Sequence, residues 1–128
     1  MTAEAAAPES IAAYGAAWVE PDATARRTLL EQAWAADAVY CDPTAVVTGR
    51  EALSDHIGGF QAAMPGGRIQ VTSEPVRHHD SAFFRWTMTD ASGATVMTGF
   101  DVVQLDRTGL IARLTGFFDS DTGTAPTS

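Results

Sequence analysis

Apolar residues recur at helical spacing in the first half of the chain. Between Glu9 and Glu20 they recur at Ile11, Tyr14, Gly15 and Trp18. Pro21 ends this run, and Asp22 can cap a second helix that continues to about Trp34. The apolar stripe of the second helix would comprise Leu29, Leu30, Ala33 and Trp34. The pattern predicts a hairpin of two helices.

A third helix is predicted after the sequence Thr48-Gly49-Arg50-Glu51, which has the form of a capping box. In that motif the Thr48 hydroxyl and the Glu51 carboxylate satisfy free backbone amides at the start of the helix. The inner stripe would comprise Leu53, Ile57, Phe60 and Met64, with His56 on its flank. Pro65-Gly66-Gly67 ends the helix, and Ala38–Asp42 before it is a short, β-prone segment.

From residue 68 onward the pattern is that of strands. The predicted strands are Arg68–His79, in which Pro75 indicates a bend or an edge, Ala82–Thr89, Ala94–Leu105 and Leu110–Phe118. Three helices followed by long antiparallel strands must bury one sheet face under the helices, so the fold class is α+β. A strongly curved sheet would leave a gap between the layers. Periodicity does not decide whether that gap is filled or open.

Composition narrows the class of protein. A length of 128 residues with 45% apolar residues predicts one domain over 1–128, folded from about 9 to 119, with mobile ends. The net charge of −8 and the absence of a basic stripe argue against nucleic acid and anionic membranes as partners. Cys41 is the only cysteine, and no signal peptide or membrane span is seen. We therefore expect a cytoplasmic location.

Two acids stand where apolar residues would be expected. Alternation along the strand puts Asp101 on an apolar face, together with Met97, Gly99, Val103 and Leu105. If that face is buried, desolvation raises the pKa of the carboxyl group, which can then donate a hydrogen bond. Asp42 ends its strand next to Pro43. For both acids a structural role stays open: Asp101 satisfied by an arginine or the backbone, and Asp42 bonded to nearby amides.

With these elements in place, the chain resembles the nuclear transport factor 2-like superfamily over about residues 9–119. Within it the chain is similar to ketosteroid isomerases and SnoaL-like polyketide cyclases. The resemblance rests on the helix-helix-strand order and on the segments 34–43, 48–53, 99–101 and 114–119. It implies a half-open cone, or cystatin-like roll, in which three N-terminal helices pack on a strongly bent, mostly antiparallel sheet around an apolar pocket. The superfamily hosts several activities, so the resemblance specifies the fold better than the function.

The resemblance also implies roles for single residues. Asp42 stands where a ketosteroid isomerase has its general base, Asp101 where it has the protonated acid of its oxyanion hole, and Tyr14 where it has the phenol. Such a set moves a proton beside a carbonyl group and needs no cofactor. The segment between Asp42 and Gly49 is shorter than in steroid isomerases, and Trp86 would narrow the pocket. We therefore expect a substrate smaller than a full steroid.

Other residues are candidates of a second rank. His56 is either an acid or base, as in dehydratase relatives, or a surface or core histidine. Seven further residues are candidate pocket residues or core residues: Trp18, Phe60, Phe84, Trp86, Met88, Met97 and Phe117. His78 and His79 are neighbours on a strand and point to opposite faces, so no metal site is expected. Arg85 is similar to the arginine of limonene epoxide hydrolases, but Thr87 and Gly116 stand at the positions of its acid partners.

Three functions follow from these residues. The first is a cofactor-independent isomerase or cyclase that acts on a small apolar carbonyl compound, steroid-like or polyketide-like. The second is a non-catalytic protein that binds a small molecule or serves as a dimeric scaffold. The third is an epoxide hydrolase in which Asp42 or Asp101 activates water. In each case we expect a homodimer through the long strands that covers Phe83, Phe100 or their neighbours.

Overall fold

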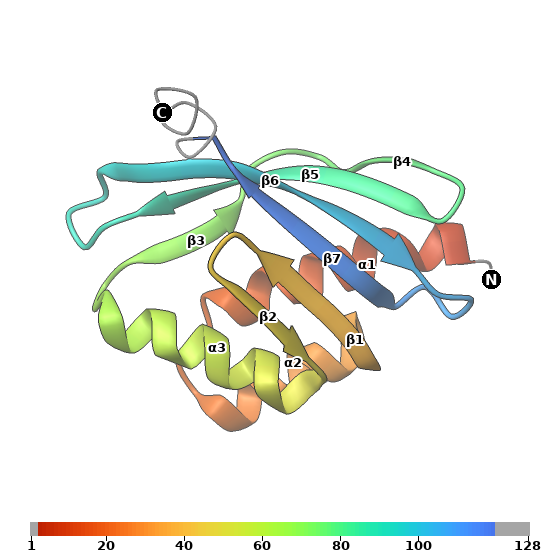
Figure 1. Ribbon diagram of the computed structural model, residues 1–128, viewed down its shortest axis with the longest axis horizontal. Helices are drawn as coiled ribbons and strands as arrows, with labels where there is room; N and C mark the ends of the chain where they lie inside the picture. The colour runs from red at the N-terminus through yellow and green to blue at the C-terminus, as the bar shows by residue number, and fades with distance from the viewer. Residues whose placement is uncertain (1–2, 120–128) are drawn as a thin grey trace.

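A computed structural model describes residues 3–119 as three helices and seven strands. The helices are α1 (Ala3–Trp18), α2 (Ala23–Ala33) and α3 (Arg50–Ala63). The strands are β1 (Trp34–Asp42), β2 (Ala45–Thr48), β3 (Arg68–Val71), β4 (Val76–His78), β5 (Ser81–Thr89), β6 (Thr95–Leu105) and β7 (Ile111–Phe118). Figure 1 shows the curved sheet arching over the three helices. The predicted α+β class and half-open cone are confirmed.

The strands form one mixed sheet in the order β2-β1-β7-β6-β5-β3, with β4 also paired to β5. The pair of β1 and β7 is parallel, and the other pairs are antiparallel. In the long central strands Asp101 of β6 lies between Phe84 of β5 and Gly116 of β7. Asp101 and Val103 are both buried, so the face of β6 that carries them looks inward.

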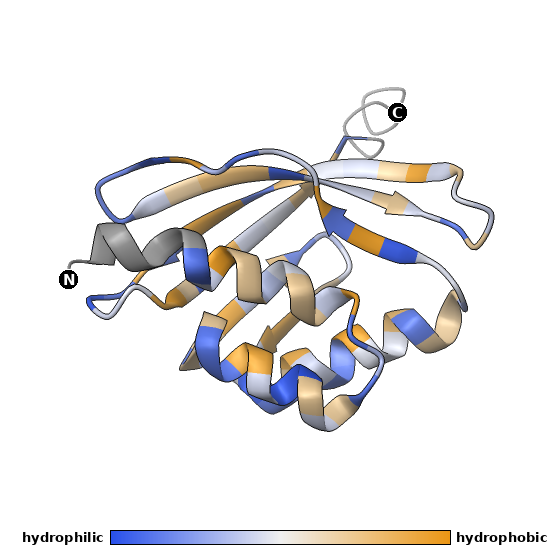
Figure 2. Ribbon diagram, turned by 180° about the vertical axis from the view of Figure 1, so that it is seen from behind, coloured by the Kyte–Doolittle hydropathy of each residue, from blue (hydrophilic) through white to orange (hydrophobic). Residues whose placement is uncertain are grey.

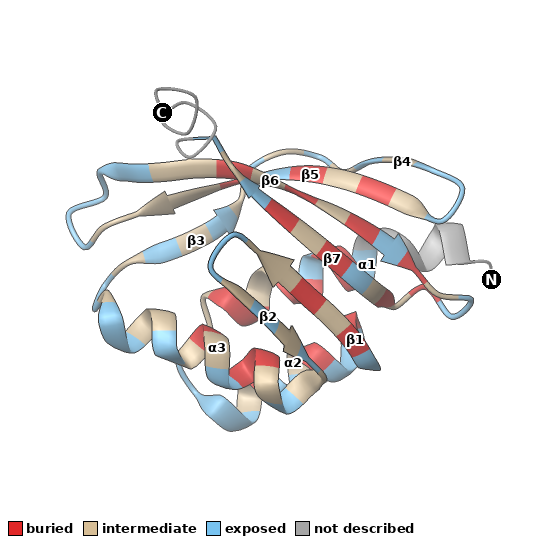
Figure 3. Ribbon diagram, in the orientation of Figure 1, coloured by how far each residue is buried: buried red, intermediate tan, exposed pale blue. Residues whose placement is uncertain are grey.

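The core lies between the helices and the concave face of the sheet, where Figure 3 shows the buried residues. Its largest fully buried side chains are Trp34, Phe84, Leu30, Leu53, Ile57, Ile111, Leu114 and Val103. Toward the edge of the sheet burial is partial. On β3 the half-buried Ile69 and Val71 alternate with the exposed Arg68 and Gln70, which Figure 2 shows as orange and blue bands.

Both ends of the helical hairpin differ from the prediction. Helix α1 begins at Ala3, before the predicted start at Glu9, in a segment whose alanines favour a helix. Asp22 caps α2 as predicted, since its carboxylate accepts a hydrogen bond from Ala25 N at 2.8 Å. Strand β1 then begins at Trp34 without a loop and contains an irregularity between Trp34 and Val39. The predicted mobile tail at 121–128 lies outside the described residues.

The predicted capping box before α3 is wrong. Gly49 is the N-cap, and no side chain caps the helix. Thr48 is instead the last residue of β2, a short strand that the sequence pattern did not reveal. Gly49 has φ 93°, a conformation that favours glycine, and this lets the chain turn sharply from the strand into the helix.

The bend predicted at Pro75 divides one expected strand into two. Strands β3 and β4 lie before and after it, and both pair with β5. The predicted bounds of β5, β6 and β7 are within one residue of those observed. No helix in the described part of the chain is long and apolar enough to cross a membrane.

A buried charge joins the helices. The side chain of Arg26 on α2 is 4% exposed, and its guanidinium donates hydrogen bonds of 3.0 to 3.2 Å to the backbone oxygens of Glu20, Pro21 and Ser54 and to Gln61 Oε1. Gln61 in turn donates to the Trp18 carbonyl at 3.2 Å. The network ties the end of α1 to α3, the two helices that line the cavity described next.

Candidate functional site

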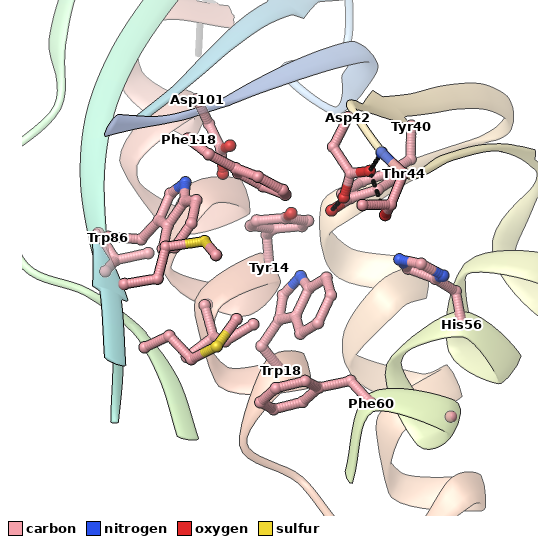
Figure 4. Close-up of a pocket in the computed structure, with 16 residues that line it drawn as sticks. Tyr14, Trp18, Tyr40, Asp42, Thr44, His56, Phe60, Trp86, Asp101 and Phe118 are labelled. Carbon is pink, nitrogen blue, oxygen red and sulfur yellow. Dashed lines mark hydrogen bonds between the residues drawn. The ribbon is translucent and has the colours of Figure 1, made fainter. Parts of the chain in front are cut away.

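A cavity of about 460 Å³ lies between the concave face of the sheet and helices α1 and α3. Helices line it with Tyr14, Gly15, Trp18, His56, Gly59 and Phe60. Strands and the turn after β1 contribute Tyr40, Asp42, Thr44, Ile69, Val71, Trp86, Met88, Met97, Asp101 and Phe118. Its size and mostly apolar lining are typical of sites for small organic molecules. Figure 4 shows the carboxyl groups of Asp101 and Asp42 close to the phenol of Tyr14, with Trp18 and Phe60 farther along the wall.

Asp101 is a buried acid in this apolar wall. It is 6% exposed, and burial raises the pKa of its carboxyl group to about 8. A hydrogen bond with Trp86 opposes part of this shift, while the charge of Asp42 adds to it. The carboxyl group is therefore mostly protonated at neutral pH and can donate a hydrogen bond into the cavity.

Tyr14 is held in place by aromatic neighbours. Its ring stacks on Trp34 with centroids 5.9 Å apart, and the edge contact with Phe84 spans 6.1 Å. Burial, and next the charge of Asp101, hold the pKa of the phenol well above its usual range. The phenol is thus a neutral donor beside a neutral carboxyl group.

Asp42 faces the same cavity but is surrounded by hydrogen-bond donors. Its Oδ1 accepts from Thr44 N at 2.7 Å, Thr44 Oγ1 at 2.8 Å and Ala45 N at 2.9 Å. Its Oδ2 accepts from the Tyr40 hydroxyl at 2.5 Å. These four bonds fix the orientation of the carboxylate. Burial and the bond to Asp42 raise the pKa of the Tyr40 phenol, which remains the donor. Asp42 therefore bonds to nearby backbone amides, which is the structural role that the sequence left open, and it also lines the cavity.

His56 lies half-buried on α3, at the side of the cavity formed by Tyr40 and Trp18. Its ring centroid is 5.1 Å from that of Tyr40 and 5.9 Å from that of Trp18. The structure thus brings Tyr14, Asp42, Asp101 and His56 to one cavity.

Two of the seven candidate pocket residues do not line the cavity. Phe84 is fully buried behind Tyr14, in the core. Phe117 is 43% exposed on the outer face, where its ring stacks on Phe100 with centroids 4.9 Å apart. Since alternate residues of a strand point to opposite faces, Phe118 lines the cavity in its place. Trp18, Phe60, Trp86, Met88 and Met97 do line it.

Sequence reasoning missed several lining residues, of which Tyr40 had a detectable signal. Tyr40 lies two residues before Asp42 on one strand, so the two side chains share a face. The place of Phe118 depends on the pairing of Gly116 with Asp101, which alternation along the strand does not give. Thr44, Ile69 and Val71 carried no such signal. Among the described residues no group of three or more His, Cys, Asp or Glu side chains could hold a metal ion.

A family model and a solved structure point to the same family of proteins. The SnoaL-like domain family matches residues 11–114. A protein from Agrobacterium tumefaciens, assigned as an isomerase of the SnoaL-like family, is 32% identical, with a TM-score of 0.82 over 90% of this chain and 98% of that chain. None of the curated proteins matches.

Two more distant structures show the fold alone. One, from Sinorhizobium meliloti and assigned as a polyketide cyclase, is 23% identical, with a TM-score of 0.66 over 85% of this chain and 94% of that chain. The other, a protein of unknown function with a cystatin-like fold from Methylobium petroleophilum, is 20% identical, with a TM-score of 0.75 over 90% of this chain and 76% of that chain.

Proposed function

The chain belongs to the SnoaL-like family, and from that premise we propose that it is a cofactor-independent isomerase or cyclase. Its substrate is a small apolar carbonyl compound, steroid-like or polyketide-like, bound in the cavity. The observation that carries the proposal is the buried, protonated Asp101 close to Asp42, whose carboxylate accepts four hydrogen bonds. Two carboxyl groups in different environments, one buried in an apolar wall and one surrounded by hydrogen-bond donors, suit acid and base roles in one reaction.

In this mechanism Asp42 removes a proton from the carbon next to the substrate carbonyl. The electron pair of the broken C–H bond moves toward the carbonyl oxygen, and the resulting enolate accepts hydrogen bonds from Asp101 and Tyr14. In an isomerase the proton on Asp42 returns to a different carbon. In a cyclase the carbanion forms a carbon–carbon bond to a second carbonyl carbon of the same molecule, the π electrons of that carbonyl move to its oxygen, and this oxygen takes the proton from Asp42.

The hydrogen bonds to Asp42 set a condition on this mechanism. The four hydrogen bonds hold the Asp42 carboxylate in one orientation, so the carbon that loses its proton must lie within reach of an oxygen held in that orientation. His56 lies at the other side of Tyr40 and is a second candidate for proton transfer.

The walls favour a compact substrate. The rings of Trp86 and Phe118 meet edge to face, with centroids 5.7 Å apart, and both line the cavity. Met88 and Met97 provide an adaptable apolar surface nearby. We therefore favour a substrate with fewer rings than a steroid.

Two alternatives use the same cavity. A binding protein would hold such a compound without turnover. An epoxide hydrolase would use Asp42 or Asp101 to activate water. The arginine that is similar to that of limonene epoxide hydrolases gives this alternative no support. Arg85 has a half-exposed side chain that lies 3.9 Å from Asp119 and is not among the lining residues.

We also propose that the outer face of the sheet forms a homodimer. The ring of Phe100 lies 4.9 Å from that of Phe117 and 5.2 Å from that of Phe83, between centroids. The Arg85 guanidinium lies over Phe83 and Phe100 at 5.5 and 5.8 Å. Aromatic and arginine side chains grouped on one face favour association with a second copy of the chain.

The test of the enzymatic proposal is turnover of β,γ-unsaturated ketones, bicyclic and steroidal, by the wild type, Asp42→Asn and Asp101→Asn. We expect turnover of the smaller ketones and a loss of about 10²- to 10³-fold in each variant, with folding checked by circular dichroism. If the wild type binds the ketones without turnover and Asp42→Asn binds them equally well, the binding-protein alternative replaces the enzyme.

A further inference from the structure

The indole N–H of Trp18 is a buried donor in the cavity wall. Trp18 is 5% exposed, and its Nε1 has no hydrogen-bond partner. The ring is fixed by edge contacts with Phe60 and His56, whose centroids lie 6.0 and 5.9 Å away, and the Trp18 carbonyl accepts from Gln61. The donor is therefore held in one place by the fold.

This donor lies next to those of the proposed oxyanion site. Figure 4 shows the Trp18 nitrogen on the side of the ring that faces the Tyr14 phenol, and Asp101 on the other side of Tyr14. The indole lies close enough to the Tyr14 phenol to lower the pKa of that phenol, against the larger effects of burial and of Asp101. The contact does not have the geometry of a hydrogen bond, so the indole N–H has no partner. Asp101, Tyr14 and Trp18 thus present three donor groups along one wall.

We propose that the Trp18 N–H donates a hydrogen bond to a second oxygen of the substrate. This inference rests on the proposed function, in which Asp101 and Tyr14 hold the first oxygen. The substrate then carries two acceptor oxygens on one edge of an apolar body, as a 1,3-dicarbonyl compound does. A buried donor without a partner is unfavourable, and a site built around it discriminates against ligands that lack the matching oxygen.

Trp34 provides an internal control. Its Nε1 is also buried without a partner, but the ring is fully buried in the core and does not line the cavity. A ligand oxygen can reach Trp18 and cannot reach Trp34. A change in the Trp18 indole signal alone therefore reports a direct contact.

The experiment uses three probes with one bicyclic body: tetralin, 1-tetralone and 2-acetyl-1-tetralone, which carry no, one and two oxygens. Proton–nitrogen spectra of the ¹⁵N-labelled protein follow the indole N–H signals, assigned with Trp18→Phe, Trp34→Phe and Trp86→Phe. We expect the diketone to move the Trp18 signal downfield more than 1-tetralone does, with the Trp34 signal unmoved. Trp18→Phe should weaken binding of the diketone about tenfold and that of 1-tetralone less than about threefold.

An unmoved Trp18 signal at saturation with the diketone, or an equal loss of affinity for both ketones in Trp18→Phe, would overturn the inference. Asp101→Asn and Tyr14→Phe separate this failure from failure of the proposed function. If they weaken binding of 1-tetralone while Trp18→Phe affects both ketones equally, only the role of Trp18 is wrong. If neither weakens it, the oxyanion site itself is wrong.

Discussion

Gly116 lies opposite Asp101 in the antiparallel pair of β6 and β7, and a Cβ atom on Gly116 would stand 2.9 Å from Asp101 Oδ1. The same Cβ would stand 3.5 Å from the Cβ of Asp42. Gly116 is not among the glycines with positive φ, so its backbone conformation suits any residue. Its importance is the space that it leaves for the two carboxyl groups.

Gly116→Ala should therefore disturb the site more than the fold. The added methyl group pushes the Asp101 carboxyl group from its place, and small displacements of catalytic groups are costly. We expect kcat/KM to fall about 10- to 100-fold, measured with the ketone substrates. Thr115→Ala, one residue earlier, is the matched control and should retain activity. Equal activity of Gly116→Ala and wild type would contradict the proposed place of Asp101 in the reaction.

The raised pKa of Asp101 makes stability depend on pH. The folded protein keeps this proton up to about pH 8, whereas the unfolded chain releases it near pH 4. Between these values the unfolded state binds fewer protons, so rising pH favours unfolding by at most about 1.4 kcal/mol per pH unit. Asp101→Asn lacks this group and should gain stability relative to wild type across the interval, with no further gain above about pH 8.

Urea unfolding of the wild type and Asp101→Asn from about pH 5 to pH 9 measures this difference, because the other titrating groups are common to both proteins. A constant difference in unfolding free energy across this range would show that the Asp101 carboxyl group is not protonated in the folded protein.

The sequence predicted the strand face of Asp101 correctly but not those of Phe117 and Phe118. Alternation along a strand indicates which residues share a face, and Asp101 shares its face with the buried Val103 and Leu105. It does not give the register between strands. The pairing of Asp101 with Gly116 puts Phe118 inside and Phe117 outside, and that pairing depends on tertiary structure.

Local motifs failed where the tertiary structure imposes another geometry. Thr48 fits a capping box, but it pairs with Val39 in a hairpin that the pattern did not reveal. Arg26 lies four residues before Leu30 and so on the buried stripe of α2, where its charge made burial unexpected. Its acceptors on Ser54 and Gln61 are 28 and 35 residues away in sequence, beyond the reach of a helical pattern.

Arg26→Met should destabilise the protein substantially. The substitution keeps an unbranched apolar stem but removes the donors for the buried oxygens of Ser54 and Gln61. We expect a loss of about 2–4 kcal/mol in the free energy of unfolding, measured with urea. Arg27→Met, at the exposed neighbouring position, should change it by less than about 0.5 kcal/mol. Similar values for the two variants would exclude a structural role for the Arg26 network.

The outer aromatic face predicts the state of association. Phe117 is 43% exposed and stacks on Phe100, so a lysine at this position would put a charge into the proposed interface, next to Arg85. Sedimentation at micromolar concentration should show a dimer for the wild type and a monomer for Phe117→Lys. Val46→Lys is the control, because Val46 is 66% exposed on β2, at the edge of the sheet far from this face's aromatic residues. A monomeric wild type would overturn the proposed dimer. A dimer that survives Phe117→Lys would show that the interface lies on another face.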